Sequence, residues 1–522
     1  MKTSRLSIIA IASLLALTGC NKSGGSKKSE SSQAQSSGES SQTSESSQPG
    51  SSSSSAGGSE SSSTSEQTGP VITEPTNITI WTTYNDNYQT IINNAIDEFK
   101  TIEPNVTITN TKQQGSYNDL AKMVTDGFAV DNYPDMVAAY PDAVSDFILN
   151  FKGLDMDPYM NDPVIGWKKA DFNDIPEAYL ELGRNYQLPG TYSLPASKST
   201  EAMFYNEDVL LGLDLSGIDA TINNGRPLND AYFQDITWEE MFEKLIPALD
   251  AYDTQQKDAG KKGIIDKTNE KWAWFGYDSD DNLFITLAQQ YGYGYTGIDE
   301  VTGNGQILFN NDGMKDLMKK LTGYQKQHYF NTSKVINDRI NNVFTTDGYL
   351  FSVGSTGGVK YQFSDKNPHN VGVVPIPHPE GEELALISQG PDFAFLDHND
   401  ENRAKALWLF FKLFTNTKYN TAWAIETGYS PIRYSVMETE DYRETADVDA
   451  QDPKTLERLQ ALNRVYSASV SDYFFTSPVF KGSSEARNQV GAIFAACVAS
   501  NNLDGEIDQI FKTAEDNTKL KM

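Results

Sequence analysis

Apolar and polar positions divide the chain into a polar first part and a globular part that begins near Asn77. Ile78–Trp81 has the composition of a short buried strand. From Ile92 to Phe99, apolar residues recur at i, i+3, i+4 and i+7, which predicts an amphipathic helix. Val106–Ile108 follows as a second strand. A strand–helix–strand unit of this kind is parallel and right-handed in nearly all proteins, so the pattern predicts an α/β fold.

Polar loops follow two of the predicted strands. Residues 82–87 follow the first strand, and Tyr140–Asp142 is expected as a loop after the strand Asp135–Ala139. If both strands belong to one parallel sheet, the loops open at its carboxyl edge, where open α/β sheets bind ligands. We therefore expect five side chains to converge there, the alternative being that each is a solvated loop residue. They are Tyr84, Asn85, Asp86, Tyr140 and Asp142.

The pattern continues to the end of the chain. We expect strands at 349–353, 371–375 and 384–387, and a deeply packed helix at 402–414, which is apolar on nearly every side. A last amphipathic helix places Cys497 on its apolar face, so this cysteine is expected in the core. The tyrosine-rich turn Tyr291–Tyr295 is expected to cover a core edge rather than to bind a ligand.

The polar first part contains a secretion signal. Lys2 and Arg5 precede a short apolar run, and small residues lead to Cys20, which is typical of a signal peptide. Leu17–Cys20 resembles the lipobox of bacterial lipoproteins, which implies cleavage after Gly19 and a diacylglyceryl group on the Cys20 sulfur. The alternative is an ordinary signal peptide that contains a cysteine. From residue 21 to about 70 the sequence is rich in Ser, Gly, Gln and Glu and is expected to be a disordered tether.

Charge and composition exclude several functions. The 522 residues carry a formal net charge of −29, which argues against binding to nucleic acid and to anionic lipid headgroups. The chain has only two cysteines, Cys20 and Cys497, so we expect no disulfide in the mature globular part. Two of the motifs that would mark an enzyme, His-Glu-x-x-His and Gly-x-Ser-x-Gly, do not occur.

Metal and cofactor sites are likewise not expected. The four histidines are scattered among polar segments, and Asp278–Asn282 begins like a calcium loop but has Leu283 where the turn needs glycine. We interpret this segment as the N-terminal cap of a helix. We therefore predict no metal, no cofactor and no catalytic residues, although a pair of glycosidase carboxylates among the many acids stays open.

Several short segments, in this order, resemble the bacterial extracellular solute-binding proteins of ABC importers, in particular the large sugar-binding family that includes maltose-binding protein. They are Ile78–Trp81, Asp97–Lys100, Tyr133–Val137, Leu194–Pro195 before Phe204–Asn206, Thr237–Glu240, Val371–Pro375 and Thr427–Pro431. The resemblance implies a two-lobed, periplasmic-binding-protein-like (Venus flytrap) α/β fold, each lobe a mostly parallel sheet flanked by helices. It places lobe 1 at 76–197 and 389–427 and lobe 2 at 198–388 and 428–522, after the signal peptide (1–19) and the lipidated, disordered tether (20–75).

The resemblance also implies where the ligand binds. The ligand-binding residues that it suggests are Thr83, Tyr84, Asn85, Asp86, Tyr140, Asp142, Ser199, Glu201, Ser355, Thr356, Gln389, Gly390, Tyr429 and Arg433. Some relatives stack a Trp of the Gly-Ser turn on the sugar. Ser355 and Thr356 occupy that place here, so stacking is expected from Tyr84, Tyr140 or Tyr429.

The sequence thus favours a lipid-anchored, monomeric binding protein that delivers a sugar or oligosaccharide to the permease and ATPase of an ABC importer. It is expected on the extracellular face of the cell membrane. One alternative is a glycerol 3-phosphate or glycerophosphodiester binder, with Arg433 or Arg487 on the phosphate. The other is a secreted glycan-degrading enzyme.

Overall fold

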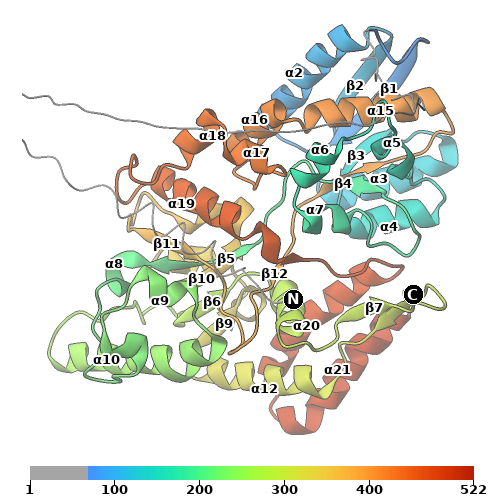
Figure 1. Cartoon of the computed structure of the whole chain (residues 1–522). Coiled ribbons are helices and arrows are strands. Elements are labelled where there is room, and N and C mark those ends of the chain that lie inside the picture. The colour runs from blue at the N-terminus through green and yellow to red at the C-terminus, as the bar shows by residue number, and fades with distance from the viewer. Residues whose placement is uncertain (1–68) are drawn as a thin grey trace, which may run out of the picture. The chain divides into compact units, whose positions relative to one another are not determined.

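A computed structural model describes residues 69–522, and we consider the unit from Pro70 to Met522 by itself. Two five-stranded sheets form its framework (Figure 1). The first has the order β2 (Val106–Lys112), β1 (Thr76–Thr82), β3 (Met136–Ala139), β13 (Asp392–Phe395) and β4 (Ser193–Leu194). The second has the order β11 (Val371–Val374), β5 (Glu201–Asn206), β10 (Phe351–Ser355), β6 (Phe275–Tyr277) and β9 (Phe330–Thr332).

Each sheet mixes strand directions. In the first sheet β1 is parallel to β2 and β3, whereas β13 is antiparallel to β3 and β4. In the second, β6 is parallel to β9 and β10, and β5 is antiparallel to β10 and β11. The α/β class is therefore confirmed, and so is the expectation of mostly parallel sheets, because four of the five strands in each sheet run in the same direction. The antiparallel pairs in each sheet come from a single reversed strand, β13 in the first and β5 in the second.

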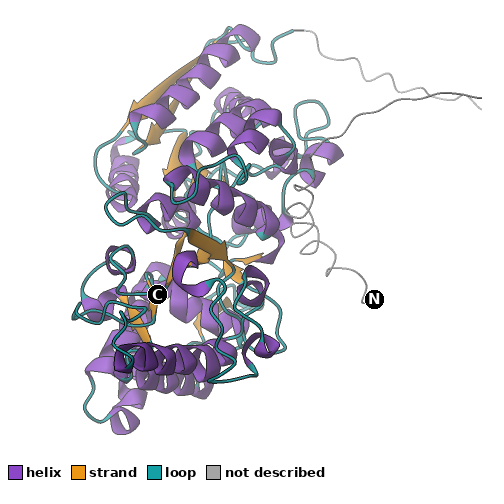
Figure 2. Cartoon of the chain, turned by 90° about the vertical axis from the view of Figure 1, so that its left-hand side faces the viewer, coloured by secondary structure: helices purple, strands orange, loops and turns teal. Residues whose placement is uncertain are grey.

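Helices flank both sheets, as Figure 2 shows. Those associated with the first sheet include α2 (Asp86–Ile102), α3 (Tyr117–Gly127), α4 (Pro141–Leu149), α5 (Asp157–Met160), α6 (Lys169–Asn173), α7 (Glu177–Leu182), α15 (Glu401–Phe414), α16 (Thr417–Thr427), α17 (Tyr434–Met437) and α18 (Glu440–Thr445). Those associated with the second include α8 (Glu207–Leu210), α9 (Asp230–Gln234), α10 (Ile246–Asp258), α11 (Asp280–Gln290), α12 (Asp312–Lys326), α13 (Ser333–Ile336), α14 (Ile340–Phe344), α19 (Leu456–Ser469), α20 (Ser483–Ala499) and α21 (Leu503–Lys519). Two small ribbons, β12 (Leu386–Ile387) with β14 (Phe474–Phe475) and β7 (Thr296–Ile298) with β8 (Gly305–Ile307), complete the strands.

The alternating burial of β1 shows why this segment forms a strand. Ile78 and Ile80 are fully buried, whereas Asn77, which lies between the buried residues Thr76 and Ile78, is exposed. α2 and α15 pack over this part of the sheet, and Phe99 of α2 meets Phe410 of α15 edge-on. The first strand, the helix after it and the second strand therefore lie where the sequence predicts them.

Three expectations outside the sheets can be compared with the structure. α15 covers the predicted helix at 402–414, and Cys497 is buried on α20, as predicted. Tyr140–Asp142 is not a loop, because Pro141 starts α4 and Tyr140 is its N-terminal cap residue. Cys20 and the expected tether up to residue 68 lie outside the described residues.

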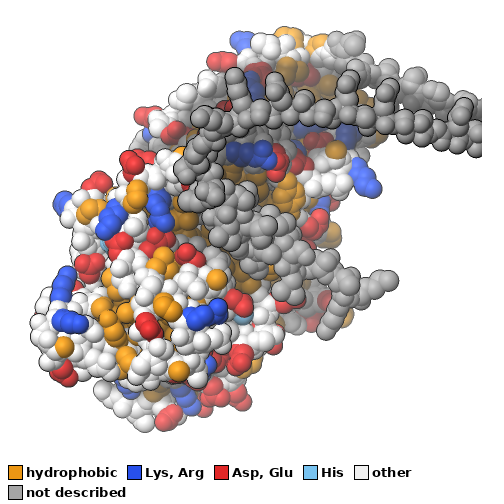
Figure 3. Space-filling model, turned by 60° about the vertical axis from the view of Figure 1, so that its left-hand side comes forward, with side chains coloured by type: hydrophobic (Ala, Val, Ile, Leu, Met, Phe, Trp, Pro, Cys, Tyr) orange, Lys and Arg blue, Asp and Glu red, His pale blue; other side chains and the backbone are white. Residues whose placement is uncertain are grey.

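One face of the surface shows how the charged side chains are distributed. On the face in Figure 3, acidic and basic side chains are interspersed with apolar ones. No helix in the described part of the chain is long and apolar enough to cross a membrane.

Candidate functional site

A cavity of about 830 Å³ lies among elements of both sheets. Its wall comes from the beginnings of α3, α4 and α20, from the start of β5 and the end of β10, and from the turn between β6 and α11. The segment between β12 and β13 adds Gln389 and Gly390. A cavity of this size accommodates a small-molecule ligand.

The structure brings together more than half of the side chains that the sequence suggested for a ligand site. Those that line the cavity are Tyr140, Asp142, Ser199, Glu201, Ser355, Gln389, Gly390 and Tyr429. Those that do not are Thr83, Tyr84, Asn85, Asp86, Thr356 and Arg433.

The residues of the loop after β1 stabilise the structure beside the first sheet and do not line the cavity. Asn85 caps α2 by accepting a hydrogen bond from the backbone N–H of Tyr88. Asp86 is exposed and pairs with Lys112 at 2.7 Å. Tyr84 is buried and meets Trp423 edge-on, with ring centroids 5.2 Å apart. These residues support the fold of this edge and are not in the cavity wall.

Two other suggested residues lie behind the wall. Thr356 is fully buried, and its hydroxyl oxygen accepts a hydrogen bond from the backbone N–H of Thr200 at 3.1 Å. The Arg433 side chain is only 5% exposed, lies 3.2 Å from Asp174 and donates to the carbonyl oxygen of Thr415. Arg433 is thus a structural cation, so it is not placed to bind the phosphate of a ligand in this cavity.

The aromatic part of the wall consists of Phe147 and four tyrosines: Tyr117, Tyr140, Tyr295 and Tyr429. Tyr117 and Tyr140 meet edge-on with centroids 5.2 Å apart. The Tyr429 ring lies against Gly357, where a Cβ atom would come within 2.7 Å of the ring. Burial raises the pKa of Tyr429 to about 12, so its hydroxyl stays a neutral donor.

Tyr117 and Tyr295 were not among the suggested residues. Tyr295 belongs to the tyrosine-rich turn that we assigned to a core edge, and it is a cavity residue as well. Tyr117 is the first residue of α3, and it reaches the cavity because α3 and α4 begin side by side. No local sequence signal distinguishes it from an ordinary first-turn residue.

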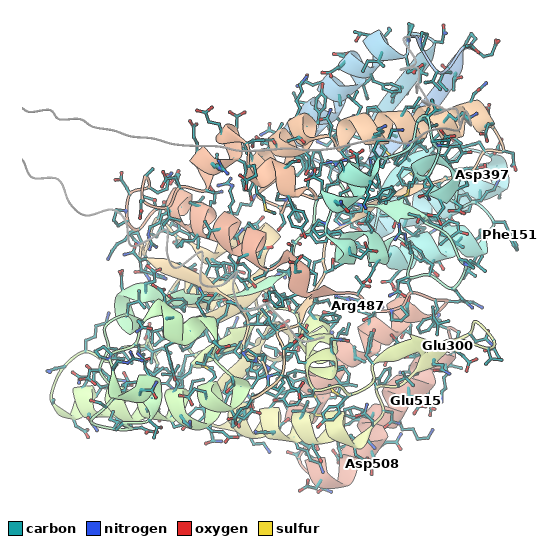
Figure 4. The ribbon with its side chains drawn as sticks, viewed as in Figure 1. Phe151, Glu300, Asp397, Arg487, Asp508 and Glu515 are labelled. Carbon is teal, nitrogen blue, oxygen red and sulfur yellow. The ribbon has the colours of Figure 1, made fainter. Side chains whose placement is uncertain are left out.

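A connected polar cluster occupies the side of the cavity formed by the second sheet. Arg487, labelled on α20 in Figure 4, donates through Nε to Asp281 at 2.6 Å and through Nη2 to the side-chain oxygen of Asn282. Asn282 donates in turn to Glu201 at 3.0 Å, and the Tyr277 hydroxyl donates to the other Glu201 oxygen. The cluster therefore runs from the buried strand β6 to the cavity.

Burial controls the ionisation of this cluster. Glu201 is 1% exposed, and burial raises its pKa to about 7 although Tyr277 and Asn282 donate to it. Burial also raises the pKa of Asp281, but the attraction of Arg487 and the Ser279 hydrogen bond outweigh burial, so the net shift is downward. Asp281 and Arg487 are accordingly an ion pair at neutral pH.

The predicted helix cap at Asp278–Asn282 is confirmed, because Ser279 caps α11. Sequence reasoning missed that the same turn lines the cavity. The described residues contain no group of three or more metal-ligating side chains arranged to hold an ion.

Segments that connect the two sheets run past the cavity. The backbone N–H of Lys198 donates to Ser430 O at 3.1 Å, and that of Ser199 donates to Gln389 O at 3.0 Å. Lys198 and Asp392 form a fully buried ion pair between two of these segments. On the far side, the Ser483 hydroxyl of α20 donates to Asp142 of α4 at 2.8 Å. Residues 198–200, 389–392 and 429–430 thus join the sheets and also border the cavity.

The family model for bacterial extracellular solute-binding proteins matches residues 94–454. The chain belongs to the bacterial extracellular solute-binding protein family. No curated protein sequence gives a significant match to it. The family description is of binding proteins, which agrees with the lack of a catalytic motif noted above.

Solved structures of solute-binding proteins share the fold. The cyclic alpha-maltosyl-1,6-maltose-binding protein of Arthrobacter globiformis is 15% identical, with 87% of this chain and 99% of that chain covered and a TM-score of 0.58. UgpB of Mycobacterium tuberculosis, in complex with glycerophosphocholine, is 14% identical, with 85% and 97% covered and a TM-score of 0.59. MalE of Listeria monocytogenes, in complex with maltose, is 16% identical, with 86% and 99% covered and a TM-score of 0.57.

Proposed function

We propose that this solute-binding protein captures a sugar or oligosaccharide in the cavity and delivers it to the permease of an ABC importer. The observation that carries the proposal is the convergence of four tyrosine rings with carboxylate, amide and hydroxyl groups on one cavity of about 830 Å³. A pyranose presents apolar C–H faces, which suit aromatic rings, and hydroxyl groups, which suit planar acceptors and donors.

The arrangement assigns different tasks to the two sides of the cavity. Tyr117 and Tyr140, from the beginnings of α3 and α4, supply ring surface. Glu201, Asn282 and Arg487 supply hydrogen-bonding groups on the other side. A ligand that contacts both sides favours the arrangement in which they face each other, and such closure around a ligand is a known switch in two-lobed proteins.

A thermal-shift screen of residues 69–522 against maltose, maltotriose and other neutral oligosaccharides tests the proposal. We expect at least one to raise the melting temperature, because a ligand that binds only the native state stabilises it. The same incubations are analysed for shortened oligosaccharides. Cleavage without a thermal shift would favour a glycan-degrading enzyme over a binding protein.

Variants then connect binding to the cavity. Tyr140 is 42% exposed in the cavity wall, and Tyr434 is 37% exposed elsewhere, so Tyr434→Ala is a matched control for Tyr140→Ala. We expect Tyr140→Ala to weaken sugar binding about tenfold through lost ring contact, with Tyr434→Ala unchanged. Equal affinity in both variants, measured by calorimetry, would remove Tyr140 from the site.

Asp142 has its own control. Asp142→Ala removes a carboxylate from the cavity wall, whereas Ser483→Ala removes the donor of their shared hydrogen bond and takes only one hydroxyl from the wall. We expect Asp142→Ala to weaken binding at least tenfold, and Ser483→Ala to have a smaller effect. If the two variants weaken binding equally, Asp142 acts by linking α4 to α20 and not by contacting the ligand.

The second part of the proposal is a lipid anchor at Cys20, followed by a tether. Two acyl chains on one residue give stable membrane attachment, whereas a single chain gives marginal binding. In cells we expect the full chain to sediment with membranes and the Cys20→Ser variant to appear in the medium. Equal membrane association of both proteins would contradict lipidation at Cys20.

A further inference from the structure

The cationic side chains in the cavity wall are already neutralised by carboxylates. They are Lys122, Arg339 and Arg487. Lys122 lies 2.5 Å from Asp126, Arg339 lies 3.1 Å from Asp278, and Arg487 lies 2.6 Å from Asp281.

Acidic side chains outnumber these cations in the wall. Asp142, Asp146, Glu201, Asp278 and Asp281 line the cavity with them, which is five carboxylates against three cations. Asp278 and Asp281 are the two that pair with wall cations. A phosphate-binding site needs positive charge that is available to the ligand, and this wall has a formal excess of negative charge.

Arg487 differs from the other two cations because its position is fixed. Its side chain is 37% exposed, compared with 72% for Lys122 and 72% for Arg339. Asp281 holds Nε, and Asn282, which itself donates to Glu201, holds Nη2. A guanidinium carries five N–H donors, so these two contacts leave donors for an acceptor in the cavity.

We infer that Asp281 makes Arg487 a donor for uncharged ligand oxygens and thereby excludes phosphate-bearing ligands from the cavity. Asn282 and Glu201 act as positioning residues for the guanidinium. The inference rests on the proposed function and narrows its ligand class to neutral, polyhydroxylated compounds. It assigns Asp281 as the residue that decides between a neutral sugar and a glycerophosphodiester or sugar phosphate.

The test frees the charge of Arg487 without removing the side chain. Asp281→Asn keeps the size of the side chain and an oxygen that can accept from Ser279, but it removes the negative charge beside the guanidinium. The matched control is Asp146→Asn, which makes the same change of charge in the cavity wall at a residue that forms none of the wall's ion pairs. Comparing the two variants separates the freed cation from the general reduction of negative charge.

Calorimetry with inorganic phosphate, glycerol 3-phosphate and maltotriose is carried out on the wild type and both variants. We expect no measurable phosphate binding by the wild type and about tenfold tighter glycerol 3-phosphate binding by Asp281→Asn than by Asp146→Asn. Glycerol 3-phosphate binding by the wild type at least as tight as maltotriose binding would overturn the inference. So would an equal gain in the two variants, because the effect would then be that of net charge alone.

The outcomes separate this inference from the function proposed above. If the wild type binds neutral oligosaccharides and Asp281→Asn gains no phosphate binding, the inference fails and the sugar proposal stands. If no neutral saccharide binds but Asp281→Asn gains phosphate binding relative to Asp146→Asn, the sugar proposal fails and the role of Asp281 stands. Melting temperatures of the ligand-free variants, together with a binding-competent fraction from calorimetry, verify that each variant is folded.

Discussion

Glu201→Gln tests whether burial of the Glu201 carboxylate makes the stability of the protein depend on pH. Groups from three elements donate hydrogen bonds to Glu201: Tyr277 of β6 and Asn282 of α11 donate to its carboxylate, and Tyr466 of α19 donates to its backbone carbonyl oxygen at 2.8 Å. The charges of Asp281 and Arg487 also act on it, and they do so in opposite directions. Burial is the largest influence and raises the pKa of Glu201 from 4.5 to about 7.

The sign of the pH effect follows from the two pKa values. Between about 4.5 and about 7 the folded protein binds more protons at Glu201 than the unfolded chain does, so stability falls as pH rises through this window. From pH 5.5 to pH 8, a shift of this size lowers the free energy of unfolding by about 2 kcal/mol. Glutamine does not titrate, so Glu201→Gln lacks this loss.

Urea unfolding at pH 5.5 and pH 8 measures the effect. We expect the free energy of unfolding of Glu201→Gln, minus that of wild type, to be about 2 kcal/mol larger at pH 8 than at pH 5.5, because only the wild type loses stability over this range. Glu181 is exposed, and Glu181→Gln serves as the control for the exchange itself. A difference between Glu201→Gln and wild type that is the same at both pH values would refute the reasoning.

Three further outcomes follow from buried contacts. Lys198→Met leaves Asp392 charged and buried, so it should lower the free energy of unfolding by about 3–5 kcal/mol, and adding Asp392→Leu should restore much of that loss in urea unfolding. Gly357→Ala places a Cβ against the Tyr429 ring, so sugar affinity in calorimetry should fall with little change in the ligand-free melting temperature. Arg433→Met removes a buried cation from Asp174 and should lower stability while leaving the affinity of the folded fraction unchanged.

The pattern of apolar residues predicted the helices and strands in which this pattern is clear, and the expected strand topology predicted part of the site. α2 lies where helical spacing places it, and β1, β2 and β3 lie where short apolar runs place them; β1 and α2 each bury one apolar face, and β3 is buried at all four positions. β4 and β13 lie beyond such reasoning, because their antiparallel pairing in the first sheet joins segments about 200 residues apart. The sheets are mostly parallel, as predicted, and only the reversed strand of each, β13 or β5, was not foreseen.

The candidate site was likewise predicted only in part from the sequence. Tyr140 and Asp142 were predicted from the carboxyl end of β3, and they line the cavity although they begin a helix rather than a loop. The side chains after β1 were misplaced because Asn85 ends the loop early by capping α2. Asp281 and Arg487 were not predicted as a pair, because α11 and α20 meet only in three dimensions.

The segments that join the two sheets also line the cavity, so the same residues take part in ligand binding and in any motion of one sheet relative to the other. Ser199, Gln389 and Tyr429 line the cavity, and Ser199 and Gln389 are paired through their backbones. On the proposed two-lobe division these residues lie in the crossovers, so a change in lobe orientation alters the cavity wall itself. A ligand shifts such an equilibrium only by its difference in affinity for the two states. Gly390, at φ +100°, supplies a backbone conformation beside these contacts that other residues rarely adopt. We therefore propose that binding and closure are coupled through Ser199, Gln389 and Tyr429.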